Sequence, residues 1–386
     1  MMNTLADTLA VLGPDLPPAL ISPENLAHIA ATVQHLPGAV TTFFGFECAL
    51  SDETPQADFL IRVTPNEVGA SILAGRSASA GLPASWQAHP IWQRILAFCQ
   101  NWTTPDSPLH NQIHNIWLEF DINHESPHPG LSEASTDDIP APSCFLGPKG
   151  CNQATAQNFK NSNVAAALRI LQDQPLSSAV ENNLRRCLAQ LPAGASVFQV
   201  GVMLARPTEA IRLCIWDILP AQIPAYLASL DWPGTGDDLA ALISTLSRFV
   251  DVITLDLDVG PTILPKIGLE CYFNTYRQPA CEPRWPLFLA YLVETGLCCP
   301  AKRDGLLAYP GWAQPDSHQA GWPDHLTPSP LLAGCYQTGF IKGVHHLKIT
   351  YQPEQPWQAK AYLYVGQMWL PIQPERVLDA SLRHSS

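Results

Sequence analysis

Ten short strand-like segments, arranged as five consecutive pairs, constrain the fold of this 386-residue chain more than any other feature. Most of them alternate apolar and polar residues with a period of two, which is typical of strands that bury one face. The pairs are residues 42–50 with 58–64, 115–122 with 143–147, 197–204 with 210–218, 252–259 with 266–274, and 345–351 with 359–366. We therefore expect a ten-stranded antiparallel sheet.

Helix-like segments separate the strand pairs. They cover residues 90–100, 154–172, 177–191, 221–230, 237–250 and 286–297. Helices that follow strand pairs pack on one face of the sheet, so the other face needs its own explanation. The sequence predicts an α+β protein with residues 1–386 in a single domain, a core over residues 42–366, and an extension at each end.

The strand face opposite the helices carries charges of both signs and large aromatic rings. Its expected members include Glu47, Arg62, Trp117, Glu119, Asp121, Arg212, Cys214, Trp216, Asp256, Asp258, Lys266, Glu270, Tyr272, His346, Lys348, Lys360, Tyr362 and Tyr364. Ten strands tend to curl, and closing the sheet removes its exposed edges. A closed barrel would gather these side chains around a polar chamber wide enough for a ligand. An open sheet with one solvated face is the alternative.

Charge and hydropathy disfavour several classes of partner. The chain has 34 acidic and 21 basic side chains and a net charge of −13, which argues against binding to nucleic acid or to anionic membranes. It has no run of about 18 apolar residues and no basic segment at its start, so we expect a cytoplasmic protein without a membrane span. The 11 scattered cysteines are typical of buried free thiols.

Common catalytic motifs do not account for the sequence. It contains no glycine-rich nucleotide loop, no Gly-x-Ser-x-Gly and no His-Glu-x-x-His, which disfavours nicotinamide enzymes, P-loop NTPases, α/β hydrolases and zinc proteases. Asp256 and Asp258 share one strand face and are weak candidates for a Mg²⁺ site. His345 and His346 precede a strand in which alternation lets only one of two neighbours face the chamber.

Ten strands in five pairs, ringed by helices, resemble the ABBA or PT-barrel prenyltransferases. The likeness is to the branch typified by dimethylallyltryptophan synthases and bacterial indole prenyltransferases. It rests on topology over residues 42–366 and on short strand phrases, which are Glu47 in GFECAL, Arg62 in the next strand, Arg212 in RLCIW, Tyr272 in ECYF, and Lys360 with Tyr362 in KAYLY.

The resemblance implies a role for each of these residues. Glu47 would be the catalytic carboxylate that orients and deprotonates the acceptor. Cations stabilise a departing diphosphate, a role that falls to Arg62, Arg212, Lys266, Lys348 and Lys360, with Tyr272 and Tyr362 as further diphosphate ligands. Rings that shield the allylic cation would be Trp117, Trp216 and Tyr364. The implied partners are dimethylallyl or geranyl diphosphate and an aromatic small molecule or a peptide side chain, with no cofactor required.

Departures from the family pattern keep a second function open. SCFLG at residues 143–147 lacks the family's Lys and Tyr, Cys214 and Trp216 replace another such pair, and Glu270 takes a Lys position. A barrel that has lost these cations would serve as a binding or accessory protein. A different enzyme that uses the carboxylate-rich chamber, with a metal at Asp256 and Asp258, is a third hypothesis.

Overall fold

The computed structural model describes residues 3–78, 80–122, 139–172, 174–234, 236–313, 322–326 and 335–371. Within these residues, ten antiparallel strands form a closed barrel, since β11 pairs with β10 on one side and with β1 on the other. The barrel strands are β1 (Phe43–Ala49), β2 (Ala57–Val63), β3 (Ile113–Phe120), β4 (Ser143–Pro148), β5 (Ser196–Val202), β6 (Ile211–Trp216), β7 (Val252–Val259), β8 (Ile263–Tyr272), β10 (Tyr336–Tyr351) and β11 (Gln358–Pro371).

The five predicted strand pairs are confirmed. Of the two predicted arrangements, the structure has the closed barrel and not the open sheet. Two strands are longer than expected, because β10 begins at Tyr336 and β11 continues to Pro371. Glycines at 339 and 343 had obscured the start of β10, although both are paired in the sheet. A short strand that was not predicted, β9 (Gly311–Ala313), lies beside this added part of β10.

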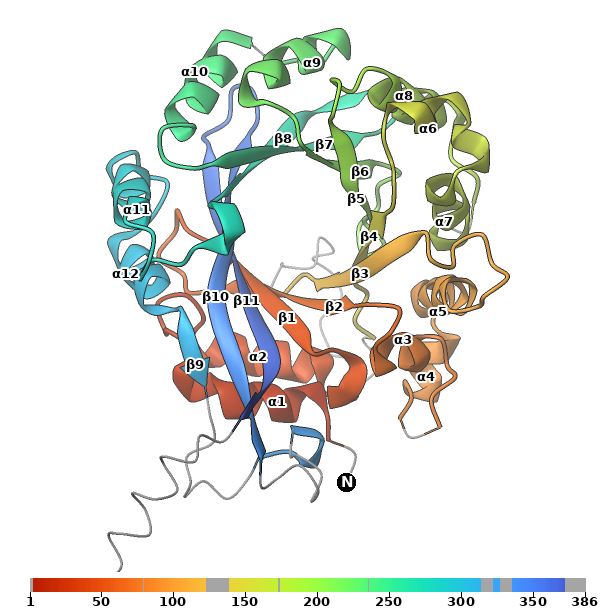
Figure 1. Ribbon diagram of the computed structural model, residues 1–386, viewed down its shortest axis with the longest axis vertical. Helices are drawn as coiled ribbons and strands as arrows, with labels where there is room; N and C mark the ends of the chain where they lie inside the picture. Colours follow the sequence, from red (N-terminus) through yellow and green to blue (C-terminus); the bar gives the residue numbers. More distant parts are fainter. Residues whose placement is uncertain are drawn as a thin grey trace, which may run out of the picture.

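Helices form an outer ring around the strands, as Figure 1 shows. Among the described residues they are α1 (Leu5–Leu12), α2 (Pro23–Val33), α3 (Val68–Leu73), α4 (Ala84–Ala88), α5 (Pro90–Trp102), α6 (Gln153–Gln157), α7 (Asn163–Leu171), α8 (Ser178–Ala189), α9 (Ile223–Ser229), α10 (Gly236–Leu246), α11 (Arg284–Glu294) and α12 (Pro300–Ala308). None of them combines the length and the apolar character that crossing a membrane requires.

One expected helix is divided into two. The segment 154–172 contains α6, a 3₁₀ turn at Phe159–Asn161, and α7. Ser162 causes the restart, because its extended backbone breaks the helix and its hydroxyl caps α7 by accepting a bond from the Ala165 N–H. Helices α1 to α4 and α12 were not predicted. The C-terminal extension beyond residue 371 lies outside the described residues.

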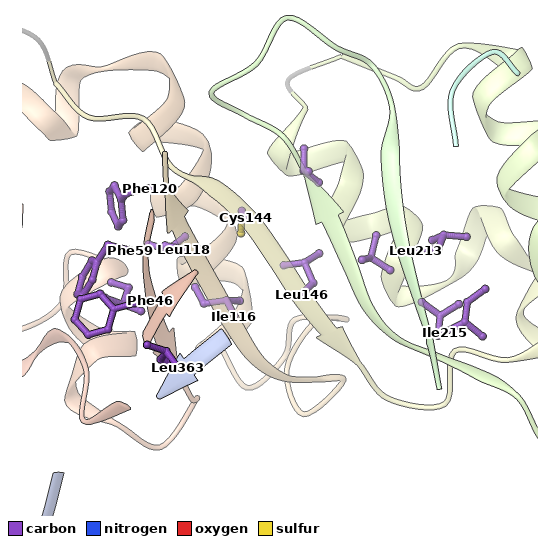
Figure 2. Close-up of a cluster of buried hydrophobic side chains, with 14 of the residues drawn as sticks. Phe46, Phe59, Ile116, Leu118, Phe120, Cys144, Leu146, Leu213, Ile215 and Leu363 are labelled. Atoms are coloured by element: carbon purple, nitrogen blue, oxygen red, sulfur yellow. The ribbon is translucent and has the colours of Figure 1, made fainter. Parts of the chain in front are cut away.

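The hydrophobic core lies between the outer face of the barrel and the helices. Figure 2 shows part of it, where Phe46, Phe59 and Phe120 from β1, β2 and β3 lie together. The rings of Phe46 and Phe59 are 5.6 Å apart, and both side chains are fully buried. Each such side chain contributes roughly 1.5–3 kcal/mol through burial. Because these residues take the outer positions, their neighbours in sequence point into the barrel.

Candidate functional site

The inside of the barrel is a chamber with a polar half and an aromatic half. The two halves share Leu60, Glu119, Arg212, Asp256, Lys348 and Tyr362, so they meet at a common boundary. The polar half lies toward the loops that join the two strands of each pair. The aromatic half lies toward the opposite ends of the strands, where the chain leaves for the helices.

Charged side chains dominate the polar half. Among the described residues that line it, five are cationic and six are carboxylic. The cations are Arg206, Arg212, Lys266, Lys348 and Lys360, and the acids are Glu47, Asp58, Glu119, Asp121, Asp256 and Asp258. Four of the five cations predicted from the sequence are therefore brought together. Arg206 was not predicted, because it lies in the loop after β5, where strand alternation gives no signal.

Most of these cations already have carboxylate partners. The Arg212 guanidinium donates two hydrogen bonds to Asp258, at 2.8 and 2.9 Å. Arg206 makes a similar pair with Asp121, at 2.8 and 2.9 Å.

The lysines complete this pattern of ion pairs. Lys348 is bonded to Asp256, and Lys360 is bonded to Glu47. Lys266 differs, since within the described ranges its ammonium forms no ion pair. Burial and the nearby Lys360 and Arg212 lower the pKa of Lys266. The positive charge of this lysine is therefore poorly balanced by the carboxylates around it.

The carboxylates of β1 to β3 divide into two kinds. Burial alone would raise the pKa of Glu47, but Lys360 and Lys348 outweigh it and lower that pKa to about 2. Burial and the negative charge of Glu47 raise the pKa of Glu119 to about 8 and that of Asp58 to about 6. The Glu119 carboxyl forms no hydrogen bond or ion pair with the described residues, and it lies at the boundary of the two halves. At neutral pH it is mostly protonated.

Aromatic rings line the other half. Its described residues include Phe43, Trp117, Phe145, Phe198, Tyr272, His345, His346, Tyr362 and Tyr364. The His346 ring stacks on Tyr362 at 4.3 Å, and Phe43 stacks on Tyr364 at 5.5 Å. Such rings can stabilise a carbocation through their electron-rich faces while they exclude water. Of the residues predicted to shield a cation, Trp117 and Tyr364 lie here.

Three of the predicted site residues lie elsewhere than expected. Arg62 does not join the cations, because its register opposite Phe43 places it at the aromatic end, with its guanidinium 4.3 Å from the Phe43 ring centre. Tyr272 also lies in the aromatic half and donates to the Glu270 carboxylate instead of facing the polar half. Trp216 lines neither half and packs edge-on against Tyr272, 5.0 Å between ring centres.

Asp256 and Asp258 do not fit a magnesium site made by these two residues. Each already bonds a cationic side chain, Lys348 and Arg212 respectively, and those partners lie on different strands. In the part of the chain that the structure describes, no three His, Cys, Asp or Glu side chains are grouped closely enough to hold a metal ion.

No protein-family model and no curated protein matches the sequence. Solved structures do. A 6-dimethylallyl tryptophan synthase has a TM-score of 0.51 and 13% identity, over 93% of this chain and 94% of that one. The apo form of prenyltransferase PriB has a TM-score of 0.49 and 14% identity, over 94% of both chains. A third structure is the 6-dimethylallyltryptophan synthase from Micromonospora olivasterospora in complex with DMASPP and Trp. It has a TM-score of 0.49 and 12% identity, over 94% of this chain and 96% of that one. The first likeness, with the closed ring of five strand pairs, shows that this chain has the ABBA or PT-barrel fold.

Proposed function

We propose that this protein is a prenyltransferase that moves an allylic group from a prenyl diphosphate to an aromatic acceptor inside the barrel. One observation carries the proposal, namely that a polar half with five cations among its described lining residues and an aromatic half meet within a single chamber. The first suits a diphosphate leaving group, and the second suits an allylic cation and a flat acceptor. The likeness to the solved structure of a 6-dimethylallyl tryptophan synthase supports the barrel fold that this proposal requires.

The reaction begins when the carbon–oxygen bond of the allylic diphosphate breaks and its electron pair stays on the diphosphate. Lys348 and Arg212 stand at the boundary, so they would face the bridging oxygen as its charge grows. Lys266, which lacks an ion pair among the described residues, would bind the far phosphate. The allylic carbon would then lie among the rings of Trp117 and Tyr362, away from water.

Charge balance decides how the diphosphate binds. Six carboxyl side chains and five cations lie in the described lining of the polar half, and four of those cations are already ion-paired. A diphosphate must therefore replace carboxylates as the partner of Lys360 or Arg212. Glu47 would then act by holding Lys360 in position, because a carboxylate with a pKa of about 2 is a weak base.

The same ion pairs favour a second candidate function, a barrel that binds a ligand without catalysis. Four of the five cations among the described lining residues are already neutralised by carboxylates. A neutral or zwitterionic aromatic molecule would enter such a chamber without breaking them. The enzyme must bind a prenyl diphosphate and transfer its allylic group, whereas the non-catalytic barrel need do neither.

Calorimetry with dimethylallyl S-thiolodiphosphate, which resists ionisation, tests the binding step. The wild type should bind it saturably, and Lys266→Met and Arg212→Met should each weaken binding about tenfold or more, since each loses a charge-assisted bond. Lys149→Met, which removes an exposed lysine after β4, is the matched control and should bind like the wild type.

Mass spectrometry then tests transfer, with dimethylallyl diphosphate and three acceptors: L-tryptophan, L-tyrosine and a short tryptophan peptide. Binding without any prenylated product would favour the non-catalytic barrel. No binding of the thiolodiphosphate at millimolar concentration would refute the prenyltransferase.

A further inference from the structure

Three inward residues of one chain segment run from the aromatic half to the polar half. Trp117 on β3 lines the aromatic half, Asp121 just after β3 lines the polar half, and Glu119 between them lines both. Alternate residues of a strand are about 7 Å apart, so each neighbour on this face is close to Glu119. Its carboxyl therefore lies between the place proposed for the diphosphate and the place proposed for the acceptor.

The register of β3 leaves the Glu119 carboxyl without a cation beside it. Glu119 lies opposite Leu60 of β2 and opposite Ser143 of β4, and neither of these side chains carries a charge. Asp258 shows the contrast, because it lies opposite Arg212 and accepts two hydrogen bonds from it. Among the carboxyls of the described lining, the one at the boundary is thus not held in an ion pair.

The Glu119 carboxyl is also open to the chamber. Its side chain is half-buried, and its oxygens are not among the fully enclosed polar atoms that lack a partner in the described ranges. A molecule bound on either side of the boundary would therefore meet this carboxyl directly.

Charges on the surrounding strands keep the proton on Glu119. Burial and the negative charges of Glu47 on β1 and Asp121 outweigh Lys348 on β10 and Arg212 on β6, so the pKa is about 8. Further titratable groups on the strands around it are Asp58 of β2, Cys144 of β4, Asp256 of β7 and Tyr362 of β11. A diphosphate in the polar half adds negative charge, which raises this pKa further.

Resting on the proposed function, we propose that Glu119 is a proton shuttle, which protonates the departing diphosphate and then takes the proton that the aromatic acceptor loses. In the first step the allylic carbon–oxygen bond breaks, its electron pair stays on the bridging oxygen, and that oxygen takes the proton of Glu119. The carboxylate that remains stands beside the allylic cation and stabilises it.

The second step returns Glu119 to its starting form. A ring carbon or ring nitrogen of the acceptor donates an electron pair to the allylic carbon, and the proton bound to that ring atom passes to the Glu119 carboxylate. The net result is one proton moved from the acceptor to the diphosphate, with no oxidation or reduction. A group whose pKa lies near the working pH suits both directions of transfer.

The other carboxyls considered for this role are less suited to it. Glu47 is bonded to Lys360, and with a pKa of about 2 it has no proton to give at neutral pH. Asp58 accepts a hydrogen bond from the Ile122 N–H and lines the polar half alone. Glu119 combines a retained proton with a place at the boundary.

The two histidines of the aromatic half are also unsuited. The register of β10 shifts between Val344 and His346 at a β-bulge that Gln278 holds through both backbone groups of Val344. Both His345 and His346 therefore line the chamber, and the expectation that only one would do so was wrong. Their Nδ1 atoms share a hydrogen bond of 2.8 Å, and Nε2 of His346 is enclosed beside Glu270. Burial and His346 lower the pKa of His345 to about 3, which makes it a weak base.

The test compares wild type and Glu119→Gln in single-turnover reactions with dimethylallyl diphosphate, first alone and then with whichever of the three acceptors the wild type prenylates. Cleavage is the sum of prenylated product and dimethylallyl alcohol, which forms when water traps the cation. Glu119→Gln should bind the thiolodiphosphate within about threefold, because the amide keeps the shape of the uncharged acid. Its cleavage rate should fall about 100-fold or more, the usual loss with a general acid.

Three further readouts exclude a merely structural effect. The kcat/KM for cleavage by the wild type should fall above about pH 8, where Glu119 loses its proton, and Glu119→Gln should lack this fall. Cleavage by the wild type should be slower in D2O, whereas that of the variant should not. Glu119→Asp, which keeps a carboxylic acid, should recover part of the rate. Glu53→Gln, an exposed change of the same kind, is the matched control and should behave like the wild type.

The possible results separate this proposal from the proposed function. If Glu119→Gln cleaves dimethylallyl diphosphate within threefold of the wild type and keeps its pH dependence, Glu119 is not the shuttle, and the prenyltransferase stands without it. If the wild type yields neither alcohol nor product with any acceptor, the proposed function fails, and this proposal fails with it.

Discussion

Glu119 offers a direct test of the electrostatics inside the barrel. Its carboxyl has a pKa of about 8 in the folded protein against 4.5 for an ordinary glutamate, because burial and the charge of Glu47 outweigh Lys348 and Arg212. Glu119→Gln keeps the shape of the side chain and removes its ionisation. We expect this variant to lose the part of the pH dependence of stability that Glu119 causes in the wild type.

The sign and size follow from proton binding in the two states. Below pH 4.5 the carboxyl is protonated whether the chain is folded or not, so it adds no pH dependence. Between pH 4.5 and 8 the unfolded chain releases the proton while the folded protein keeps it, which costs about 1.4 kcal/mol of stability per pH unit. From pH 5 to pH 8 the wild type should therefore lose about 4 kcal/mol relative to Glu119→Gln.

Urea denaturation followed by tryptophan fluorescence, at each pH unit from 5 to 9, measures this difference. The free energy of unfolding of the variant minus that of the wild type should rise with pH and level off above pH 8. Glu53→Gln, in the exposed loop between β1 and β2, should give a flat difference. A Glu119→Gln difference that varies by less than about 1 kcal/mol over this range would refute the charge clustering described here.

Three further predictions concern stability. Lys348→Met leaves the buried Asp256 carboxylate without its bonded lysine and should cost about 3–5 kcal/mol in urea denaturation; an unchanged midpoint would show that this pair is not buried. Phe59→Ala removes a fully buried ring from the layer in Figure 2 and should also cost about 3–5 kcal/mol, so a loss below 1 would contradict the packing. Gly69→Ala places a Cβ 1.9 Å from a backbone oxygen and should lower the midpoint of thermal unfolding, whereas Gly81→Ala, with open space around it, should not; equal midpoints would contradict the close approach.

Strand periodicity predicted most of the side chains that enter the barrel. On β1, the side chains of Phe44, Phe46 and Cys48 are fully or almost fully buried against the helices on the outer face of the barrel. Gly45 and Glu47 therefore face the inside. The same alternation placed the inward residues of most other strands. It works because one face of each strand is buried by helices, and a shift of one residue would expose that whole face.

Periodicity does not give the height of a residue along the barrel, and this is where the predicted site departed from the structure. Arg62 and Lys360 both belong to the inner face, yet one lies opposite Phe43 at the aromatic end and the other opposite Ala49 at the polar end. That height depends on the register between strands distant in sequence.

Local irregularities escaped the sequence for a related reason. Arg206 reaches the polar half from a loop, where no alternation exists. It bonds Asp121, which precedes it by 85 residues in the sequence. His345 enters the chamber through a bulge, which inserts one residue into an otherwise regular strand. Both features depend on contacts between distant segments, Asp121 in the first case and Gln278 in the second.

Closure of the barrel by β1 and β11 also sets an order for its synthesis. Phe43 pairs with Gly366, so the last join needs two segments separated by more than 300 residues. During translation, the strands before β11 can form at most an open sheet, with β1 and β10 at its edges, until β11 leaves the ribosome. The chamber forms only with that final strand, and long-range pairing of this kind is slow. Nascent chains that stall before residue 358 should therefore be prone to edge-to-edge association and should depend on chaperones, whereas released chains that include β11 should not.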